Sequence, residues 1–157
     1  MTSAGTAADG RSYPSRLPRH SVSAAGVVVR RDGRVLAIRR ADNGAWVPPG
    51  GVVELDEDPR DTVRREVLEE TGVRAEPEML TGVYKNMRRG IVSLVFRCKF
   101  VAGEPRPTPE AREAVWLGPN QITDLMAEAF AVRLLDAIGP GSAGPHVRIH
   151  DGHSLLG

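Results

Sequence analysis

The sequence predicts an α/β protein of the α+β type, in which a mixed β-sheet lies between helices as an αβα sandwich. Two observations carry this prediction. Strand-like segments come in two groups, and each group is followed by a helix-like segment. The length of 157 residues leaves room for one domain with tails and not for a second full domain.

Three segments follow from composition. Residues 1–20 are small, polar and basic without apolar periodicity, which predicts a disordered N-terminal arm. Residues 21–139 carry the periodic patterns and form the predicted folded domain. Residues 140–157 begin with a Gly- and Pro-rich linker, and we expect either a tail or a last edge strand there.

The folded part opens with two strands. The apolar run 24–29 is typical of a strand buried on both faces. Asp32 and Gly33 predict a hairpin turn, because this pair accepts positive φ, and residues 34–40 form the returning strand. Trp46 begins a further short strand, which the Pro-Pro-Gly-Gly segment 48–51 ends.

Residues 58–71 have the start and stop signals of a helix. Asp58 is the expected N-cap, Pro59 occupies the first helical position, and Gly72 follows the last turn. Val63 and Val67 are four residues apart and mark the core face.

The remaining elements are read from apolar runs and breakers. Cys98 lies in an apolar strand and is expected to be a core residue. The predicted elements are a strand within 73–86 broken near Pro77, strands at 91–101 and 114–117, and a helix at 120–138 that allows a break near its start.

Composition excludes several classes of function. The formal charge of +1 gives no overall attraction to nucleic acid or to anionic membranes. A single cysteine rules out an internal disulfide framework and a Cys-based zinc site. No apolar run approaches the ~20 residues of a membrane span, and no signal-peptide pattern opens the chain. We expect a cytoplasmic protein, monomer or homodimer, without membrane or specific nucleic-acid partners.

Charge is concentrated in one segment, residues 51–73. It carries eight acidic and three basic side chains, a local charge of −5 that leaves +6 on the rest of the chain. At about 100° per residue, Glu66, Glu69 and Glu70 share one helix face within an arc of about 100°. Val63 and Val67 place the core beside these acids, which predicts that they line the rim of a cleft and not a solvated surface.

Convergent carboxylates favour a site for hard divalent cations such as Mg²⁺, which binds carboxylate oxygens and substrate phosphates together. Gly50 and Gly51 let the backbone approach closely, so a carbonyl there is a further candidate ligand.

The same segment resembles the Nudix box, G-x5-E-x7-R-E-U-x-E-E-x-G-U, where U is a bulky aliphatic residue. All nine fixed positions match; they are Gly51, Glu57, Arg65, Glu66, Val67, Glu69, Glu70, Gly72 and Val73. The flanking segments fit the same pattern. A Trp-x-x-Pro-Gly-Gly segment, Trp46–Gly51, leads into the box, and an acid-then-Trp segment follows it from Glu110 to Trp116. The sequence therefore resembles the Nudix hydrolase family (MutT-like), whose fold is also an αβα sandwich.

The resemblance implies hydrolysis of a nucleoside diphosphate linked to another moiety, with Mg²⁺ as cofactor and Mn²⁺ as a possible substitute. It implies that the metal ligands are Glu66, Glu69 and Glu70 with the Gly50 or Gly51 carbonyl, that Glu57 closes the site, and that Arg65 orients the glutamates. The general base stays open among Glu69, Glu70 and Glu110.

Candidate substrate contacts lie outside the box. Arg39 ends a strand and is expected either to bind phosphate or to form a surface ion pair. Lys85 and Arg88 crowd a turn that contacts substrate or is merely solvated, and Tyr84 either stacks on a base or belongs to the core. Family substrate markers are mostly missing, so a nucleotide sugar, ADP-ribose and a modified nucleoside triphosphate stay open. The alternative function is a Nudix-fold sensor that binds nucleotide without turnover.

Overall fold

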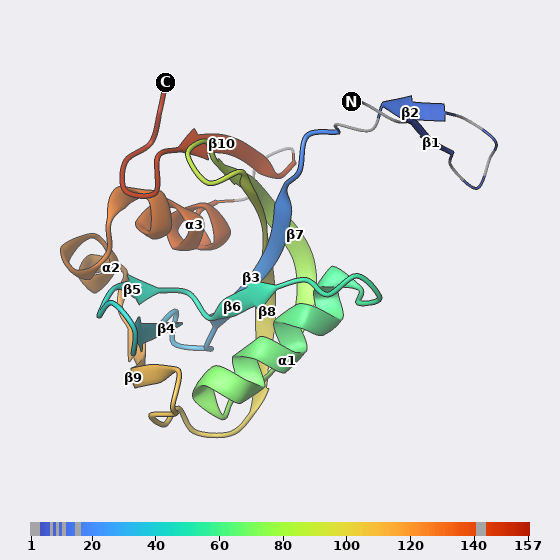
Figure 1. Ribbon diagram of the computed structural model, residues 1–157. Coiled ribbons are helices and arrows are strands. Elements are labelled where there is room, and N and C mark those ends of the chain that lie inside the picture. The colour runs from blue at the N-terminus through green and yellow to red at the C-terminus, as the bar shows by residue number, and fades with distance from the viewer. Residues whose placement is uncertain (1–3, 7, 9, 11, 15–16, 141–143) are drawn as a thin grey trace.

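An eight-stranded mixed sheet runs through the middle of the structure, with α1 on one face and α2 and α3 on the other (Figure 1). The computed structural model describes residues 4–6, 8, 10, 12–14, 17–140 and 144–157. This arrangement confirms the predicted αβα sandwich. The helices are α1 (Pro59–Thr71), α2 (Pro119–Leu125) and α3 (Glu128–Ile138).

The strands combine parallel and antiparallel pairs. They are β3 (Ser21–Val29), β4 (Val35–Arg40), β5 (Trp46–Val47), β6 (Gly50–Val52), β7 (Arg74–Asn86), β8 (Ile91–Ala102), β9 (Ala111–Leu117) and β10 (His146–His150). The order is β10-β7-β8-β3-β4-β5, with β6 added to β3 and β9 added to β4. The parallel pairs are β3 with β8 and β10 with β7.

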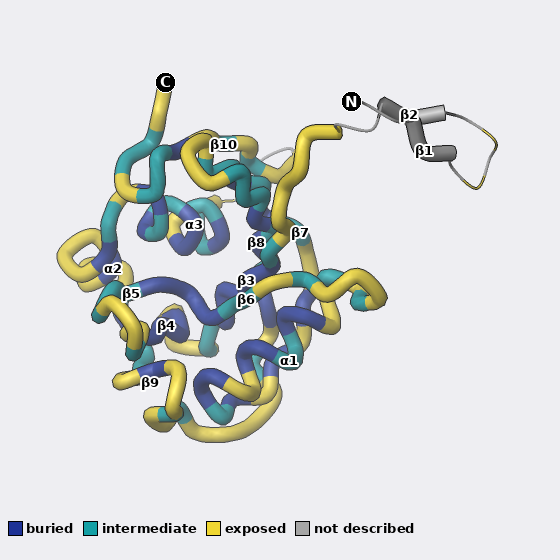
Figure 2. The backbone as a smooth tube through the Cα atoms, in the orientation of Figure 1, coloured by how far each residue is buried: buried dark blue, intermediate teal, exposed yellow. Residues whose placement is uncertain are grey.

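Strand β3 is buried on both faces, as its apolar run predicts, and it divides the core in two (Figure 2). Ala25 and Val27 face the cluster under α2 and α3, whereas Ala24 and Val28 face the cluster under α1. This alternation is the period-two pattern of a strand. Cys98 packs in the second cluster and is 2% exposed, which confirms that it is a core residue.

The caps of α1 are those that the sequence predicts. The Asp58 side chain accepts a hydrogen bond from the backbone N–H of Arg60 at 2.8 Å, and Pro59 follows at the first position. The helix ends at Gly72, whose φ of +81° is the left-handed conformation that glycine adopts without strain. Val63 and Val67 are fully buried against the sheet, so the rotation of α1 is fixed.

Two predicted breaks are placed differently in the structure. Strand β7 continues through Pro77, because the register with β8 shifts between Pro77 and Met79 and a bulge absorbs the missing N–H donor. The helix expected over 120–138 is two helices, α2 and α3, separated at Met126 and Ala127, both of which have extended backbone.

The C-terminal segment joins the sheet. Strand β10 pairs in parallel with β7, from His146 opposite Gly82 to His150 opposite Asn86. The chain then returns to α3, where the backbone N–H of Ala129 donates to the carbonyl of His153 at 2.9 Å. Ala127 gives α3 no side-chain cap, so the C-terminal segment satisfies one of its free N–H groups.

The N-terminal residues include a short hairpin. Strands β1 (Ala4–Thr6) and β2 (Ser12–Pro14) pair antiparallel and extend away from the domain in Figure 1. Part of the predicted disordered arm over 1–20 lies outside the described residues, so that expectation stays a prediction. None of the helices in the described parts of the chain is long and apolar enough to span a bilayer.

Candidate active site

Three carboxylates converge beside the buried face of α1. Glu66 and Glu70 lie one turn apart and are 9% and 5% exposed, and Glu110 reaches them from the loop before β9. One oxygen from each carboxylate lies within 4.8 Å of the others. Burial and the facing carboxyl group of Glu66 raise the pKa of Glu70 well above its ordinary value. Buried like charges of this kind are satisfied by a cation.

The donor set fits a hard divalent ion. All three ligands are carboxylate oxygens, which Mg²⁺ and Mn²⁺ accept, and no sulfur or imidazole takes part in the cluster. Glu66, Glu70 and Glu110 would hold such an ion. Of the residues predicted as ligands, Glu66 and Glu70 belong to this cluster, whereas Glu69 and Glu57 do not.

Gly50 and Gly51, at the start of the box, are required by close contacts. A Cβ atom on Gly51 would lie 2.5 Å from the carboxyl carbon of Glu66, and one on Gly50 would lie 2.5 Å from the carbonyl oxygen of Ala24. The backbone N–H of Gly50 also donates to Oε1 of Glu70 at 3.3 Å. Strand β6 therefore passes directly over both buried carboxylates.

The guanidinium of Arg65 contacts three acidic side chains. Its Nε donates to Oε2 of Glu57 at 2.9 Å and its Nη1 donates to Oε1 of Glu66 at 2.7 Å, while Oε2 of Glu69 lies 3.5 Å from Nη1. The Thr62 hydroxyl donates to Glu57 as well, and these bonds lower the pKa of Glu57 to about 2. Arg65 thus contacts Glu57 and Glu66 together, which is the arrangement expected of a residue that orients the glutamates.

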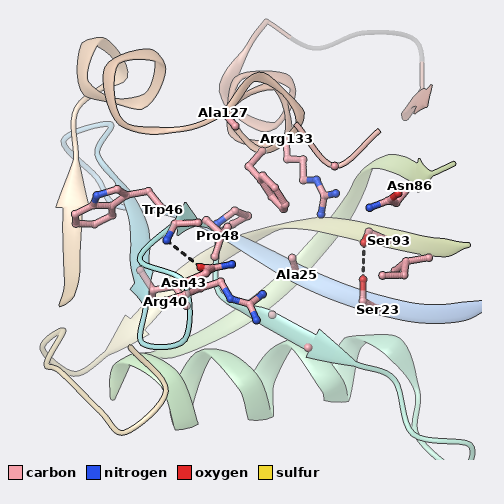
Figure 3. A pocket seen from close by; sticks show the side chains of 18 of the residues that line it. Ser23, Ala25, Arg40, Asn43, Trp46, Pro48, Asn86, Ser93, Ala127 and Arg133 are labelled. Atoms are coloured by element: carbon pink, nitrogen blue, oxygen red, sulfur yellow. Dashed lines mark hydrogen bonds between the residues drawn. The ribbon is translucent and has the colours of Figure 1, made fainter. Parts of the chain in front are cut away.

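Two of the three carboxylates, Glu70 and Glu110, line a large open pocket. Its volume is about 1220 Å³, and it extends from Gly50, Gly51, Glu70 and Glu110 across β3 to the C-terminal segment. Figure 3 shows Arg40 and Asn43 near Trp46 and Pro48, and Asn86, Ser23 and Ser93 farther along the strands. The hydroxyl groups of Ser23 and Ser93 form a hydrogen bond with each other.

The predicted cationic contacts are only partly placed at this pocket. Arg88 lines it, but Arg39 and Lys85 do not. The Nε of Arg39 donates to the carbonyl of Gly44 at 3.2 Å, and its guanidinium pairs with Glu113 at 3.5 Å. Its neighbour Arg40 lines the pocket instead and pairs with Asp42 at 2.6 Å. The register of β4 with β9 shifts between these two arginines, so simple strand alternation selects the wrong one.

Tyr84 does not contact the pocket, so the expectation that it binds substrate is wrong. Its side chain is fully buried, and its hydroxyl donates to Oδ2 of Asp136 at 2.7 Å. Burial and that carboxylate raise its pKa. The aromatic side chains that do line the pocket are Trp46 and Phe130. The position of Trp46 just before the glycines was the available signal for it.

Comparison with known proteins identifies, over most of the chain, the same family that the sequence motif resembles. The family model described as NUDIX domain matches residues 19–138. A MutT-like protein of Streptomyces ambofaciens is 61% identical over 139 residues, which cover 88% of this chain and 89% of that protein. An ADP-ribose pyrophosphatase of Methanocaldococcus jannaschii is 32% identical over 117 residues, 70% of this chain and 69% of that protein.

A solved structure shows the same fold. The NUDIX hydrolase from Nitrosomonas europaea superposes with a TM-score of 0.74 at 19% sequence identity, covering 95% of this chain and 94% of that structure.

Proposed function

Because this chain belongs to the Nudix hydrolase family, we propose that it hydrolyses the diphosphate of a nucleoside diphosphate linked to a second moiety, with Mg²⁺ as cofactor. The chain is a hydrolase of pyrophosphate bonds. The identity of its substrate and the identity of its metal are what we propose here. We assign the second moiety as a sugar, as in a nucleotide sugar or ADP-ribose. The name of the relative from Methanocaldococcus jannaschii and the pocket volume of about 1220 Å³ support this choice.

The observation that carries the proposal is the convergence of Glu66, Glu70 and Glu110, two of which, Glu70 and Glu110, line one end of that pocket. A divalent ion bound by these carboxylates supplies charge neutralisation for a diphosphate and an acidified water. The cluster thereby places the reacting end of the substrate, and the rest of the pocket is left for the nucleoside and the sugar.

Neighbouring backbone and side-chain groups hold the carboxylates of this cluster in place. Arg65 fixes the carboxylate of Glu66, and the N–H of Gly50 fixes that of Glu70. Glu110 is exposed on its loop, and its carbonyl accepts the N–H of Ala41 at 2.9 Å, which ties the loop to the end of β4. We assign the Glu110 carboxylate as the base that takes the proton of the attacking water. The water oxygen bonds to phosphorus as the bond to the bridging oxygen breaks.

The test is a screen of nucleotide sugars, ADP-ribose and modified nucleoside triphosphates with identification of products. We expect release of a nucleoside monophosphate that needs Mg²⁺ and stops in EDTA. Glu70→Gln should lower kcat by roughly 100-fold or more. Glu78→Gln is the matched control, since Glu78 is an exposed glutamate on β7 outside the pocket, and it should leave kcat unchanged.

Two outcomes contradict the proposal. Full activity in excess EDTA would exclude a metal at the carboxylates. Tight nucleotide binding without release of any product, from a correctly folded protein with Mg²⁺, would favour the sensor function instead.

A further inference from the structure

Arg133 on α3 is a buried cation in the wall of the pocket. Its side chain points into the cavity in Figure 3, and the residue is 6% exposed. Its Nε donates to the carbonyl of Ala129 at 3.1 Å, and its guanidinium lies 4.7 Å from the ring centre of Phe130. Within the described chain no carboxylate forms an ion pair with it, and burial lowers its pKa. A buried charge without a counter-charge is costly and calls for a partner.

The two carboxylates on the same helix, Glu128 and Asp136, already have partners, and Glu128 accepts the backbone N–H of Leu155. Asp136 accepts the hydroxyl of Tyr84 at 2.7 Å and two bonds from the guanidinium of Arg148, both at 2.8 Å. Its charge is therefore compensated from the other side, and Arg133 keeps a net positive charge facing the pocket.

His150 adds a second unsatisfied donor at the same place. The backbone N–H of Gly152 donates to its Nδ1 at 2.9 Å, so the single proton of the neutral ring lies on Nε2. That Nε2 is 3.1 Å from Nη2 of Arg133, which can only donate. Burial and Arg133 lower the pKa of His150, which favours the neutral ring. Two buried donors thus face each other, and an acceptor that bridges them would satisfy both.

A third donor borders the same space. Oδ1 of Asn86 accepts the backbone N–H groups of Arg88 and Arg89 at 3.0 and 3.1 Å, which leaves the amide nitrogen of Asn86 to the pocket. In Figure 3 this nitrogen lies on the side of Asn86 that faces Arg133. The wall therefore presents donors and a positive charge from α3, β7 and β10.

From these contacts we infer that Arg133 and His150 form a subsite for an anionic oxygen group, a phosphate or a carboxylate, that the substrate carries in addition to the hydrolysed diphosphate. The inference rests on the proposed function, since both use one pocket. Gly50, which contacts Glu70, pairs with Ala25 of β3, whereas His150 pairs with Asn86 of β7, and β8 lies between these two strands, so the subsite faces the carboxylates across the pocket. The substrate therefore has to extend across the strands between β6 and β10 to reach both ends of the pocket.

The experiment compares substrates that differ only in one anionic group. UDP-glucose is paired with UDP-glucuronic acid for the carboxylate, and ADP-ribose is paired with its 2′-phosphate for the phosphate. We expect wild-type kcat/KM to be roughly tenfold higher or more for the anionic member of at least one pair, since bonds to charged groups are the stronger ones. Which pair responds identifies the source of the anion. Equal values within both pairs overturn the inference without any variant.

Two variants assign the effect to the subsite. Arg133→Gln should remove the preference by raising KM for the anionic member only, and Arg133→Lys should restore part of it. Arg97→Gln is the matched control, because Arg97 also donates to a carbonyl of α3, at 3.1 Å, yet lies outside the pocket. Equal losses on both members of a pair in Arg133→Gln would show a structural role or recognition of a neutral base edge.

A binding measurement separates this inference from the proposed function. Calorimetric titration of the four nucleotides in EDTA needs no hydrolysis, and the anionic member should bind wild type roughly tenfold more tightly than it binds Arg133→Gln. A difference in binding without any turnover would leave the subsite in place and contradict the hydrolase. Turnover without a difference in binding would contradict the subsite alone.

Discussion

Gly51 and Glu66 are so close that the glycine leaves no room for any side chain: an added Cβ atom would lie 2.5 Å from the glutamate's carboxyl carbon. The contact couples the strand before the helix to one of the metal-binding candidates.

Gly51→Ala should damage activity far more than stability. The group that has to move is the flexible end of Glu66, so the free energy of unfolding changes little, but the carboxylate leaves its place and kcat/KM falls by about 10- to 100-fold. Gly26→Ala is the contrasting variant, since its Cβ would lie 2.8 Å from Cγ1 of core residue Val63. It should cost about 1–3 kcal/mol in thermal or urea unfolding. An active Gly51→Ala protein would argue against the Glu66 assignment.

The pH dependence of stability should report Glu70. Its pKa is raised in the metal-free folded protein, so its contribution to stability is full below the unfolded value near 4.5 and is lost as pH rises through the folded value. Glu70→Gln should flatten this loss in melting curves recorded in EDTA. Added Mg²⁺ should raise the wild-type melting temperature most at high pH, where the proton no longer competes. A wild-type protein that gains stability with pH through this range in EDTA would contradict the assignment.

Arg65→Lys should lower activity by about 10- to 100-fold while the fold persists. One ammonium group cannot replace a guanidinium that donates to both carboxylate oxygens of Glu57 and to Glu66. Mg²⁺ affinity, measured by titration, should fall together with kcat. Arg64→Lys is the control, because Arg64 bonds Glu76 and Asp61 on the exposed side of α1 and should leave both quantities unchanged.

Deletion of residues 1–20 should leave the melting temperature of the domain nearly unchanged. The segment lacks apolar periodicity, and the hairpin β1–β2 points away from the domain in Figure 1. Differential scanning calorimetry of the full and shortened chains checks this. A drop of several degrees would show that the arm packs, either on its own domain or on a second copy.

The predictable half of the site is the half that local sequence controls. Asp58, Pro59 and Gly72 define α1 by capping rules, and the spacing of the glutamates places Glu66 and Glu70 on one face of that helix. The sequence resemblance supplied the reaction type, which the family match confirms.

The other half depends on pairings between distant segments. Arg133 lies on α3 and His150 on β10, and they meet only because β10 pairs with β7, which no local pattern indicates. Similarly, the register of β4 with β9 shifts between Arg39 and Arg40, and Arg40 lines the pocket where the sequence pattern suggests Arg39. Tyr84 follows the strand period and is buried, so its polar group was satisfied by Asp136 and not by a ligand.

Strand β10 and the turn after it supply a part of the pocket that is separate in sequence from the carboxylates. The carboxylates come from the middle of the chain, whereas the wall that closes the far end of the pocket includes His150 to His153, close to the C-terminus. That wall is attached through edge pairing with β7, through bonds from the C-terminal segment to Ala129 and Glu128 at the start of α3, and through the pair of Arg148 with Asp136. A change in the last residues of the chain can therefore alter which molecules are selected while the bond-breaking residues stay as they are.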